Sequence, residues 1–424
     1  MTSIAGGSRT SLLPNLAAEE GEDWRAYPGT PQARAAAHLW ALLFSRGSTL
    51  HHPLGSARGA WHERSRESLW PVALGEAPNE AVWPWLEGAA GARAWLNTES
   101  IAASARQIFA SQLAGPTPEC VRRVHDKAFA TGAARELGLM PRALEPLIEV
   151  LDPSDLVDAE ALGARLEAAR LRWPAWTGGR FTLKPRFGCS GRGRVGGRGA
   201  VTVDPLRGAL PRLAARGGAI FEPWLERSKD LSVSLHVPEP DDVAWPTIVG
   251  SLEMLVNASG AFRGHCGEVD NRGRVFSGDG DDETLRADAA AVAGRAREEG
   301  FSGPCGVDSF RYAEADRERL RGAVEFNARP TMGLVCIGLV RRALPQVREA
   351  LDLTPGQRRG FLLTTLEPDA DVEAAVTALV EAAGAGARCF DLTTPDDAGS
   401  AHPLLVFARE LAPLRAAHRD QLGC

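Results

Sequence analysis

From Pro118 onwards, the sequence alternates between helical patterns and short runs of β-branched and other apolar residues, and this alternation leaves few fold classes open. Helices are predicted at 119–137, 159–171, 283–299 and 333–351. Strands are predicted at 180–184, 200–203, 219–221, 231–237, 247–256, 305–312 and 322–327, the last two joined by a charged loop at 313–321. Such a succession is typical of an α/β or α+β chain.

The 424 residues exceed what one hydrophobic core usually organises, so two or three packed units are expected. Residues 1–117 hold most of the tryptophans and two predicted helices, at 32–45 and 100–113, and they end at the breaker cluster Gly115–Pro118. The tail adds strands at 361–364, 388–392 and 404–407 and a helix at 372–383. The predicted units are 1–117, 118–224, 225–352 and 353–424, the last a small α/β appendage.

Several classes of protein are disfavoured by composition. A net charge of −6 argues against a general nucleic-acid binder, and no apolar run of membrane-spanning length is present. The N-terminus does not resemble a secretory signal, and the seven cysteines form no CxxC pair. We therefore expect a cytoplasmic protein without a membrane or nucleic-acid partner. A homodimer is plausible.

Lysine is rare in this chain. Of 48 basic residues only Lys127, Lys184 and Lys229 are lysine, in a background of arginine. A lysine that survives in such a background can mark a site where a compact, flexible ammonium is needed instead of a planar guanidinium. Three lysines are too few to show such a site by their number alone. Their positions in the sequence must therefore be considered together with the motifs around them.

The first segment with chemical potential runs from Lys184 to Arg194, where a strand delivers a lysine into a glycine-rich loop. Glycines let backbone N–H groups approach an anion, and the lysine adds a point charge for phosphate oxygens. The lysine precedes the glycines, so this is not a Walker A loop. A glycine-rich hairpin turn would give the same pattern, and the loop alone leaves both interpretations open.

A second segment begins where the strand at 219–221 ends in Glu222-Pro-Trp-Leu225 and leads to Asp230. An adenine ring needs an apolar slot with backbone hydrogen-bonding groups, and ribose hydroxyls suit a carboxylate. Taken alone, the segment is more typical of a linker with a packed tryptophan.

A third segment pairs Asp308 with the strand that contains Glu325, Asn327 and Arg329. Alternate residues of a strand share one face, so these three side chains are expected on the side opposite to the apolar ones. Two carboxylates and an amide oxygen on adjacent strands form the hard-oxygen site that Mg²⁺ prefers. A solvated polar face with a salt bridge to Arg329 is the plainer alternative.

Together, these segments resemble the ATP-grasp superfamily over about Glu119 to Gly333, particularly its carboxylate–amine ligases. The family's first lysine, at an Asp-Lys helix start, matches Asp126-Lys127, and a stretch like Gly138-Leu-Met-Pro141 follows. The resemblance implies two α+β subdomains that grip ATP, behind an N-terminal pre-ATP-grasp-like domain. The implied nucleotide-binding residues are Lys127, Lys184, Gly188, Ser190, Gly191, Gly193, Glu222, Trp224, Leu225 and Asp230. The implied magnesium ligands are Asp308, Glu325 and Asn327, and the implied catalytic residues are Lys184 and Arg329.

The resemblance implies an ADP-forming reaction in which a carboxylate becomes an acyl phosphate and an amine displaces the phosphate, with an amino acid or peptide as the expected substrate. Arg311 and Arg263 remain alternatives to Arg329 for stabilising the intermediate. Lys229 is expected to have a solvated surface role, and the segment 263–268 to be a surface hairpin, although it could line the substrate pocket. A phosphotransferase or a non-catalytic ATP-binding protein would share the nucleotide half.

Overall fold

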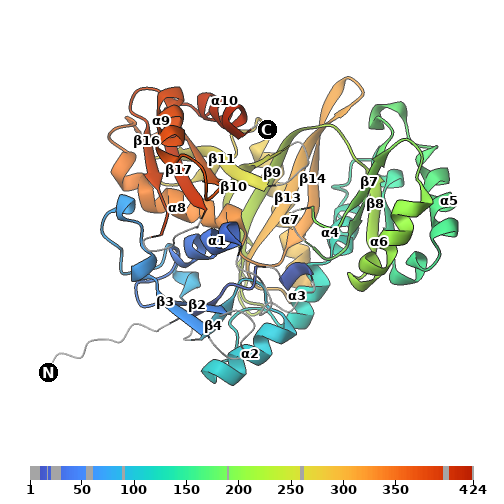
Figure 1. Ribbon diagram of the computed structural model, residues 1–424, viewed down its shortest axis with the longest axis horizontal. Coiled ribbons are helices and arrows are strands. Elements are labelled where there is room, and N and C mark those ends of the chain that lie inside the picture. The colour runs from blue at the N-terminus through green and yellow to red at the C-terminus, as the bar shows by residue number, and fades with distance from the viewer. Residues whose placement is uncertain are drawn as a thin grey trace.

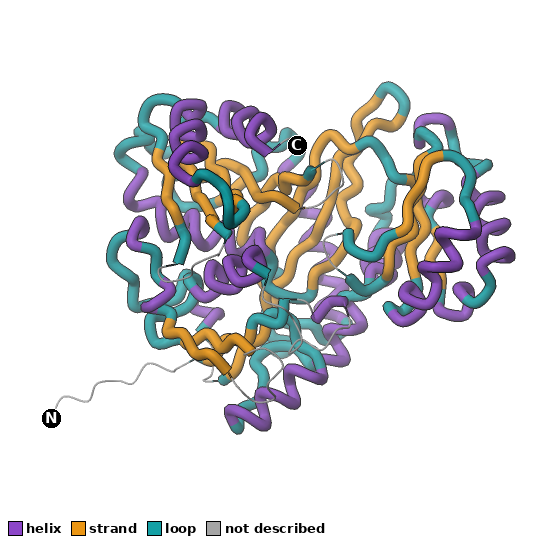
Figure 2. The backbone as a smooth tube through the Cα atoms, in the orientation of Figure 1, coloured by secondary structure: helices purple, strands orange, loops and turns teal. Residues whose placement is uncertain are grey.

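The computed structural model describes residues 10–16, 18–20, 30–53, 61–87, 91–188, 191–257, 262–394 and 401–422. The chain forms three sheets with helices around them (Figure 1). A four-stranded N-terminal sheet and a four-stranded sheet within 149–223, the part of the chain here called the lid, flank a nine-stranded central sheet, whose strands run through the middle of Figure 2. Among the described residues, the structure contains no helix with the length and apolarity needed to cross a membrane.

The N-terminal sheet has the order β3-β2-β1-β4, and β1 is parallel to both of its neighbours. Its strands are β1 (Ser11–Leu13), β2 (Thr49–Pro53), β3 (Trp61–Ser65) and β4 (Ala92–Ala94), accompanied by α1 (Pro31–Ala41) and α2 (Glu99–Phe109). Both predicted helices exist but end four residues early. Trp40 and Trp95 meet edge to face in the core, with ring centroids 5.6 Å apart, which explains part of the tryptophan content.

The lid contains α5 (Ala159–Arg170) and α6 (Val203–Ala215), which share a hydrophobic core with the sheet β5-β8-β6-β7. Helices α3 (Pro118–Val124) and α4 (Lys127–Glu136) precede the lid, and α4 packs against β14 (Arg317–Asn327) and α7 (Asp282–Glu298) instead. The strands of the lid are β5 (Glu149–Leu151), β6 (Arg180–Pro185), β7 (Val195–Arg198) and β8 (Ala219–Pro223), all antiparallel to their neighbours. Helix α6 was not predicted, and the strand predicted at 200–203 is wrong. Strand β6 pairs with β8 on one side and with β7 on the other. In β7, Gly197 accommodates the neighbouring Phe181, because an added Cβ at Gly197 would lie 2.9 Å from the Phe181 ring.

The single helix predicted at 119–137 is in fact two helices. The helix is interrupted at His125 and Asp126. The Asp126 carboxylate accepts a hydrogen bond from the N–H of Ala128 at 2.8 Å. Asp126 therefore caps α4 and makes Lys127 its first residue.

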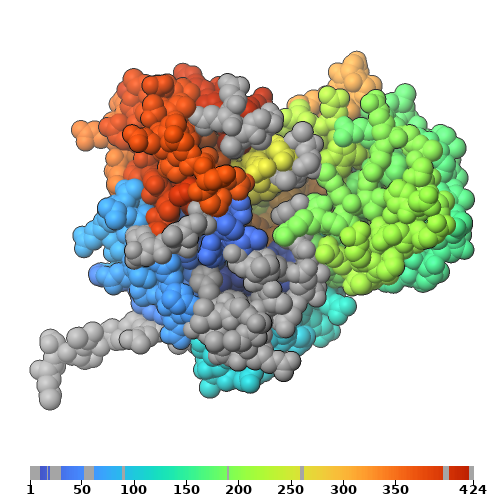
Figure 3. Space-filling view, viewed as in Figure 1, coloured from blue at the N-terminus to red at the C-terminus, as the bar shows by residue number. Residues whose placement is uncertain are grey.

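The central sheet has the order β14-β13-β9-β10-β12-β11-β15-β17-β16. Its strands are β9 (Arg227–Val237), β10 (Thr247–Val256), β11 (Phe262–Asp270), β12 (Val275–Phe276), β13 (Gly303–Glu314), β14 (Arg317–Asn327), β15 (Arg358–Leu366), β16 (Arg388–Asp391) and β17 (His402–Ala408). Helices α7 (Asp282–Glu298), α8 (Met332–Val347), α9 (Val372–Ala383) and α10 (Leu411–Leu422) cover it. The predicted strands and helix of the tail exist, and β15 pairs with β11, so the tail extends this sheet and lies beside the N-terminal unit (Figure 3).

The charged loop predicted at 313–321 is wrong. Strands β13 and β14 continue to a tight turn at Ala315, whose φ is +56°. Their charged residues are compatible with pairing because β14 is the edge strand of the sheet, where charged side chains reach water.

Candidate active site

The floor of the site is one face of the central sheet. Phe310 on β13, Asp230 on β9, Met254 on β10 and His265 on β11 stand opposite one another in register. A cavity of about 820 Å³ lies over this face and is lined by residues of the lid, the central sheet and the N-terminal unit. Twelve of the predicted site residues line it: Lys127, Lys184, Gly188, Gly191, Glu222, Trp224, Leu225, Asp230, Asp308, Glu325, Asn327 and Arg329. Gly193 is not among the lining residues, and Ser190 lies outside the described residues.

Two of the three lysines reach the cavity, Lys127 from the start of α4 and Lys184 from β6 of the lid. The Lys127 ammonium donates to the carbonyl oxygen of Gly188 at 2.6 Å and lies 3.0 Å from Glu325 Oε1. Lys184 on β6 places its ammonium 2.7 Å from Glu222 Oε1, and burial lowers the pKa of Lys184. The third lysine, Lys229, is bonded to Asp279 at 3.0 Å and does not line the cavity. The rare lysines thus divide into two inside the site and one outside it.

Glu222 is buried between two cations. Its second carboxylate oxygen accepts from Arg321 Nη1 at 2.8 Å, opposite the contact with Lys184. Burial opposes ionisation of this carboxyl, but the charges of Arg321 and Lys184 outweigh it and lower the Glu222 pKa to about 2. The ionised Glu222 therefore holds the Lys184 side chain at the cavity wall.

The segment after Glu222 joins the lid to the central sheet. The guanidinium groups of Arg194 and Arg227 lie over the Trp224 ring, at 4.1 Å and 4.7 Å from its centroid. The next residue, Leu225, is buried. Further along β9, Asp230 accepts a hydrogen bond from Arg227 at 2.7 Å. The segment therefore presents an aromatic ring, an aliphatic side chain and a carboxylate to one end of the cavity.

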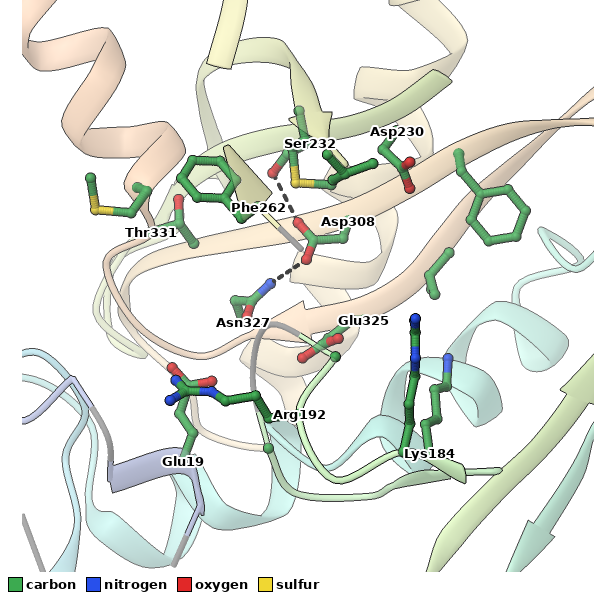
Figure 4. Close-up of a pocket in the computed structure, with 18 of the residues that line it drawn as sticks. Glu19, Lys184, Arg192, Asp230, Ser232, Phe262, Asp308, Glu325, Asn327 and Thr331 are labelled. Atoms are coloured by element: carbon green, nitrogen blue, oxygen red, sulfur yellow. Dashed lines mark hydrogen bonds between the residues drawn. The ribbon is translucent and has the colours of Figure 1, made fainter. Parts of the chain in front are cut away.

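The predicted metal ligands lie together on β13 and β14. Asp308 accepts hydrogen bonds from Ser232 Oγ and from Asn327 Nδ2, both at 3.0 Å, and it pairs across the ladder with Glu325 (Figure 4). Burial and the neighbouring Glu325 charge raise the pKa of Asp308 to about 6. Two carboxylates that repel each other at a cavity wall form an oxygen donor set that a hard cation such as Mg²⁺ would stabilise. Among the described residues, no cluster of three or more His, Cys, Asp or Glu could hold a metal, so a cation here would depend on the Asn327 amide or on substrate oxygens.

One participant was not found by sequence analysis. Glu19, in the short helix η1 (Ala18–Glu20), lines the cavity and forms an ion pair with Arg329, just beyond β14. His125 Nε2 lies 3.6 Å from the other oxygen of Glu19. Burial alone would raise the Glu19 pKa, but Arg329 and His125 lower it to about 2. No motif surrounds Glu19, and only the tertiary structure identifies it.

The other candidate arginines lie elsewhere. Arg311 is bonded to Asp279 at 2.6 Å, Arg263 is bonded to Glu367 at 3.3 Å, and neither lines the cavity. Arg329 alone of the three reaches the site.

The surface hairpin predicted at 263–268 is wrong, because this segment is part of β11 inside the central sheet. Its residue His265 is only 3% exposed and lines the cavity, as the alternative interpretation of this segment expected.

Solved structures of other proteins have a similar fold. No protein-family model matches the chain, and no curated protein sequence matches it. An N5-carboxyaminoimidazole ribonucleotide synthetase solved as an ADP complex is 13% identical with a TM-score of 0.52, over 98% of this chain and 97% of that one. The Staphylococcus aureus N5-carboxyaminoimidazole synthetase complexed with ADP is 11% identical with a TM-score of 0.51, over 100% of this chain and 98% of that one. Pyruvate carboxylase from Rhizobium etli is 12% identical with a TM-score of 0.50, over 98% of this chain and 37% of that one.

These similarities establish the architecture and confirm the fold expected from the motifs. The chain has the ATP-grasp fold.

Proposed function

We propose that this chain is an ADP-forming, ATP- and Mg²⁺-dependent ligase that joins a carboxylate to an amine. The observation that carries the proposal is the convergence of Lys127 and Lys184 with Asp308, Glu325 and Asn327 on one cavity. Two ammonium groups and an oxygen donor set are what a magnesium nucleotide needs. The ATP-grasp fold and the ADP complexes of two structures that share it support the same assignment.

The nucleotide would lie between the lid and the central sheet. The adenine would occupy the slot at Trp224 and Leu225, with Asp230 near the ribose hydroxyls. Lys127, Lys184 and the backbone of the loop at Gly188 and Gly191 would contact the phosphates. The lysines already hold carboxylates in this structure, so phosphate oxygens would compete for the same ammonium groups.

Bound Mg²⁺ would neutralise phosphate charge during transfer. Asp308, Glu325 and Asn327 would hold the ion. Their other role is electrostatic. Without a metal ion the Asp308 and Glu325 carboxylates repel each other, even though Lys127 lies 3.0 Å from Glu325 Oε1, so the site favours a further positively charged ligand.

In the proposed reaction, a substrate carboxylate oxygen attacks the γ-phosphorus of ATP, and the bond from that phosphorus to the β-γ bridging oxygen breaks. ADP leaves and an acyl phosphate remains. The amine nitrogen then attacks the acyl carbon, loses a proton, and inorganic phosphate departs. Arg329 is the cation best placed to stabilise negative charge on the acyl group, and the lid would exclude water from the intermediate.

A screen for ADP and phosphate release over panels of small acids and amines tests this proposal. Release is expected only when both an acid and an amine are present, whereas a phosphotransferase would release ADP with one acceptor and no inorganic phosphate. Lys184→Ala and Glu325→Ala are expected to reduce turnover at least 100-fold while circular dichroism stays unchanged. Lys229→Ala is the matched control, because Lys229 lies outside the cavity and its partner Asp279 keeps its bond to Arg311. Full ADP release by the Lys184 or Glu325 variant would overturn the assignment.

A further inference from the structure

The cavity has two chemically different ends. Figure 4 shows Lys184 on one side of the metal-ligand group and Phe262 and Thr331 on the other, with Asp308 between them. The Lys184 end carries the ammonium group of Lys184, which is held by the Glu222 carboxylate. The opposite end, here called the second compartment, lies around Phe262 and Thr331. It includes Val256, which pairs with Phe262 across the ladder, and Met332, which follows Thr331.

The walls of the second compartment come from elements that are far apart in the sequence. Val256 lies on β10, Phe262 begins β11 and Met332 begins α8. Ala33 and Ala36 of α1, which contacts α8, line the same cavity. A cavity of about 820 Å³ is near the upper end of ligand pockets, which span roughly 300–1,000 Å³. It therefore has room for a second ligand beside a nucleotide.

His265 is the polar side chain that distinguishes this compartment. It is 3% exposed, its Nδ1 is buried, and that atom has no hydrogen-bond partner among the described residues. Burial lowers the His265 pKa to about 3, so the imidazole is neutral near pH 7. A buried polar atom without a partner is unfavourable, and a ligand that hydrogen-bonds to it would remove this penalty.

The sheet places His265 at a defined position relative to the nucleotide end. Asp230, Met254 and His265 stand in one row on consecutive strands. Neighbouring strands are spaced by about 4.8 Å, so His265 lies roughly 10 Å from Asp230 along the floor. The ring centroid of Phe262 lies 4.8 Å from that of His265, so the Phe262 ring gives the imidazole an apolar neighbour.

The charges near the second compartment do not favour a phosphorylated ligand. Arg329 is already paired with the buried Glu19, and Figure 4 shows Arg192 of the lid loop directed toward the same carboxylate. The guanidinium of Arg263, the next arginine on β11, is bonded to Glu367 outside the cavity. A phosphate in this compartment would have to compete with these carboxylates for its cations.

We infer that the second compartment binds a small acid or amine with an apolar side chain and no phosphate, and that His265 hydrogen-bonds to an uncharged polar group of this ligand. The inference rests on the proposed ligase function for its reaction but not for its binding. The substrate class is therefore a hydrophobic acid or amine, with the reacting group directed toward Asp308 and Arg329.

Binding can be measured separately from turnover. Isothermal titration in the presence of ADP and Mg²⁺ would compare leucine, phenylalanine, their deaminated acids and decarboxylated amines with O-phosphoserine. At least one apolar ligand is expected to bind tenfold more tightly than O-phosphoserine. Phe262→Ala and His265→Phe are expected to weaken that ligand at least tenfold, and His265→Gln, which keeps a neutral hydrogen-bonding group, should restore part of the loss. Trp245→Ala, an exposed aromatic residue outside the cavity, is the control.

The outcomes separate the two proposals. Preferential binding of O-phosphoserine, no binding of any apolar ligand, or equal affinity in the Phe262 and His265 variants would overturn the inference and leave the ligase assignment standing. Apolar binding that depends on His265, without ADP release in any combination of acid and amine, would support the inference and overturn the ligase assignment.

Discussion

Glu19 and Arg329 form a buried ion pair that joins the N-terminal unit to the end of β14. The Glu19 side chain is 1% exposed and that of Arg329 is 12% exposed. The ring centroid of Trp95 lies 5.5 Å from the Arg329 guanidinium, and His125, which lies near Glu19, accepts a hydrogen bond from the N–H of Ala328 at 3.2 Å. The arginine nearest the proposed acyl group is therefore positioned by residues from three parts of the chain.

Removing one member of this pair is expected to be costly. Glu19→Ala removes the buried carboxylate that pairs with Arg329, and breaking a buried ion pair by removing one partner costs about 3–5 kcal/mol. The double variant Glu19→Leu/Arg329→Met should recover most of this loss, because both charges of the pair are replaced by apolar side chains. Urea denaturation measures both free energies of unfolding. Glu67→Ala, which breaks the exposed pair with Arg46, should change stability by less than about 1 kcal/mol. If the double variant were as unstable as the single one, the contribution would be packing instead of charge.

Acid should destabilise the protein through Glu19 and Glu222. Both have pKa values lowered to about 2 from an ordinary 4.5. A carboxyl whose pKa is lower in the folded state contributes stability that is complete above pH 4.5 and disappears as the pH falls toward 2. Urea midpoints measured between pH 6 and pH 2 should therefore decline most steeply below pH 4.5. The double variant that lacks Glu19 and Arg329 should decline less over this range, and an identical decline would contradict the assigned role of Glu19.

The sequence was sufficient for the parts of the site that depend on local pattern. Lys127 follows a helix-capping aspartate, and Asp308 and Glu325 lie on strands whose polar and apolar residues alternate. These features are encoded within a few residues, so motif order predicted that they would share a cavity. The strands of the tail were also predictable, but their pairing with β11 depends on register between distant segments.

Glu19 and His265 show what local pattern does not contain. Glu19 lies in a three-residue 3-10 helix without a motif, and its role arises only when β14 brings Arg329 beside it. The segment around His265 was expected at the surface, because nothing nearby indicates that β10 and β15 cover both of its edges. In the same way, the charges near 313–321 predicted a loop, since an edge strand and an exposed loop tolerate similar residues.

The carboxylate pair on β13 and β14 predicts a conflict between stability and function. Asp308→Asn removes the repulsion with Glu325 and the cost of a buried charge, so it should stabilise the unliganded protein at pH 7 by on the order of 1–3 kcal/mol. If the proposed function holds, Mg²⁺ and ADP together should raise the melting temperature of the wild-type protein, and the same variant should lose this rise. Thermal unfolding with and without these ligands measures both effects. Asp316→Asn, in the exposed turn between the two strands, should change neither, and a less stable unliganded Asp308→Asn protein would show that its hydrogen bonds outweigh the repulsion.

Gly306 explains why no side chain enters the cavity two residues before Asp308. A Cβ at this position would lie 2.7 Å from Cγ2 of Thr331, whose hydroxyl caps α8 by accepting from the N–H of Leu334 at 3.1 Å. Gly306→Ala should therefore displace the start of α8 and cost about 1–3 kcal/mol, as overpacked cores do. Thr331→Ser removes the methyl group that clashes and keeps the capping hydroxyl, so Gly306→Ala/Thr331→Ser should recover most of the lost stability. Urea denaturation of the single and double variants tests this coupling. Additive losses in the double variant would show that the strain arises elsewhere.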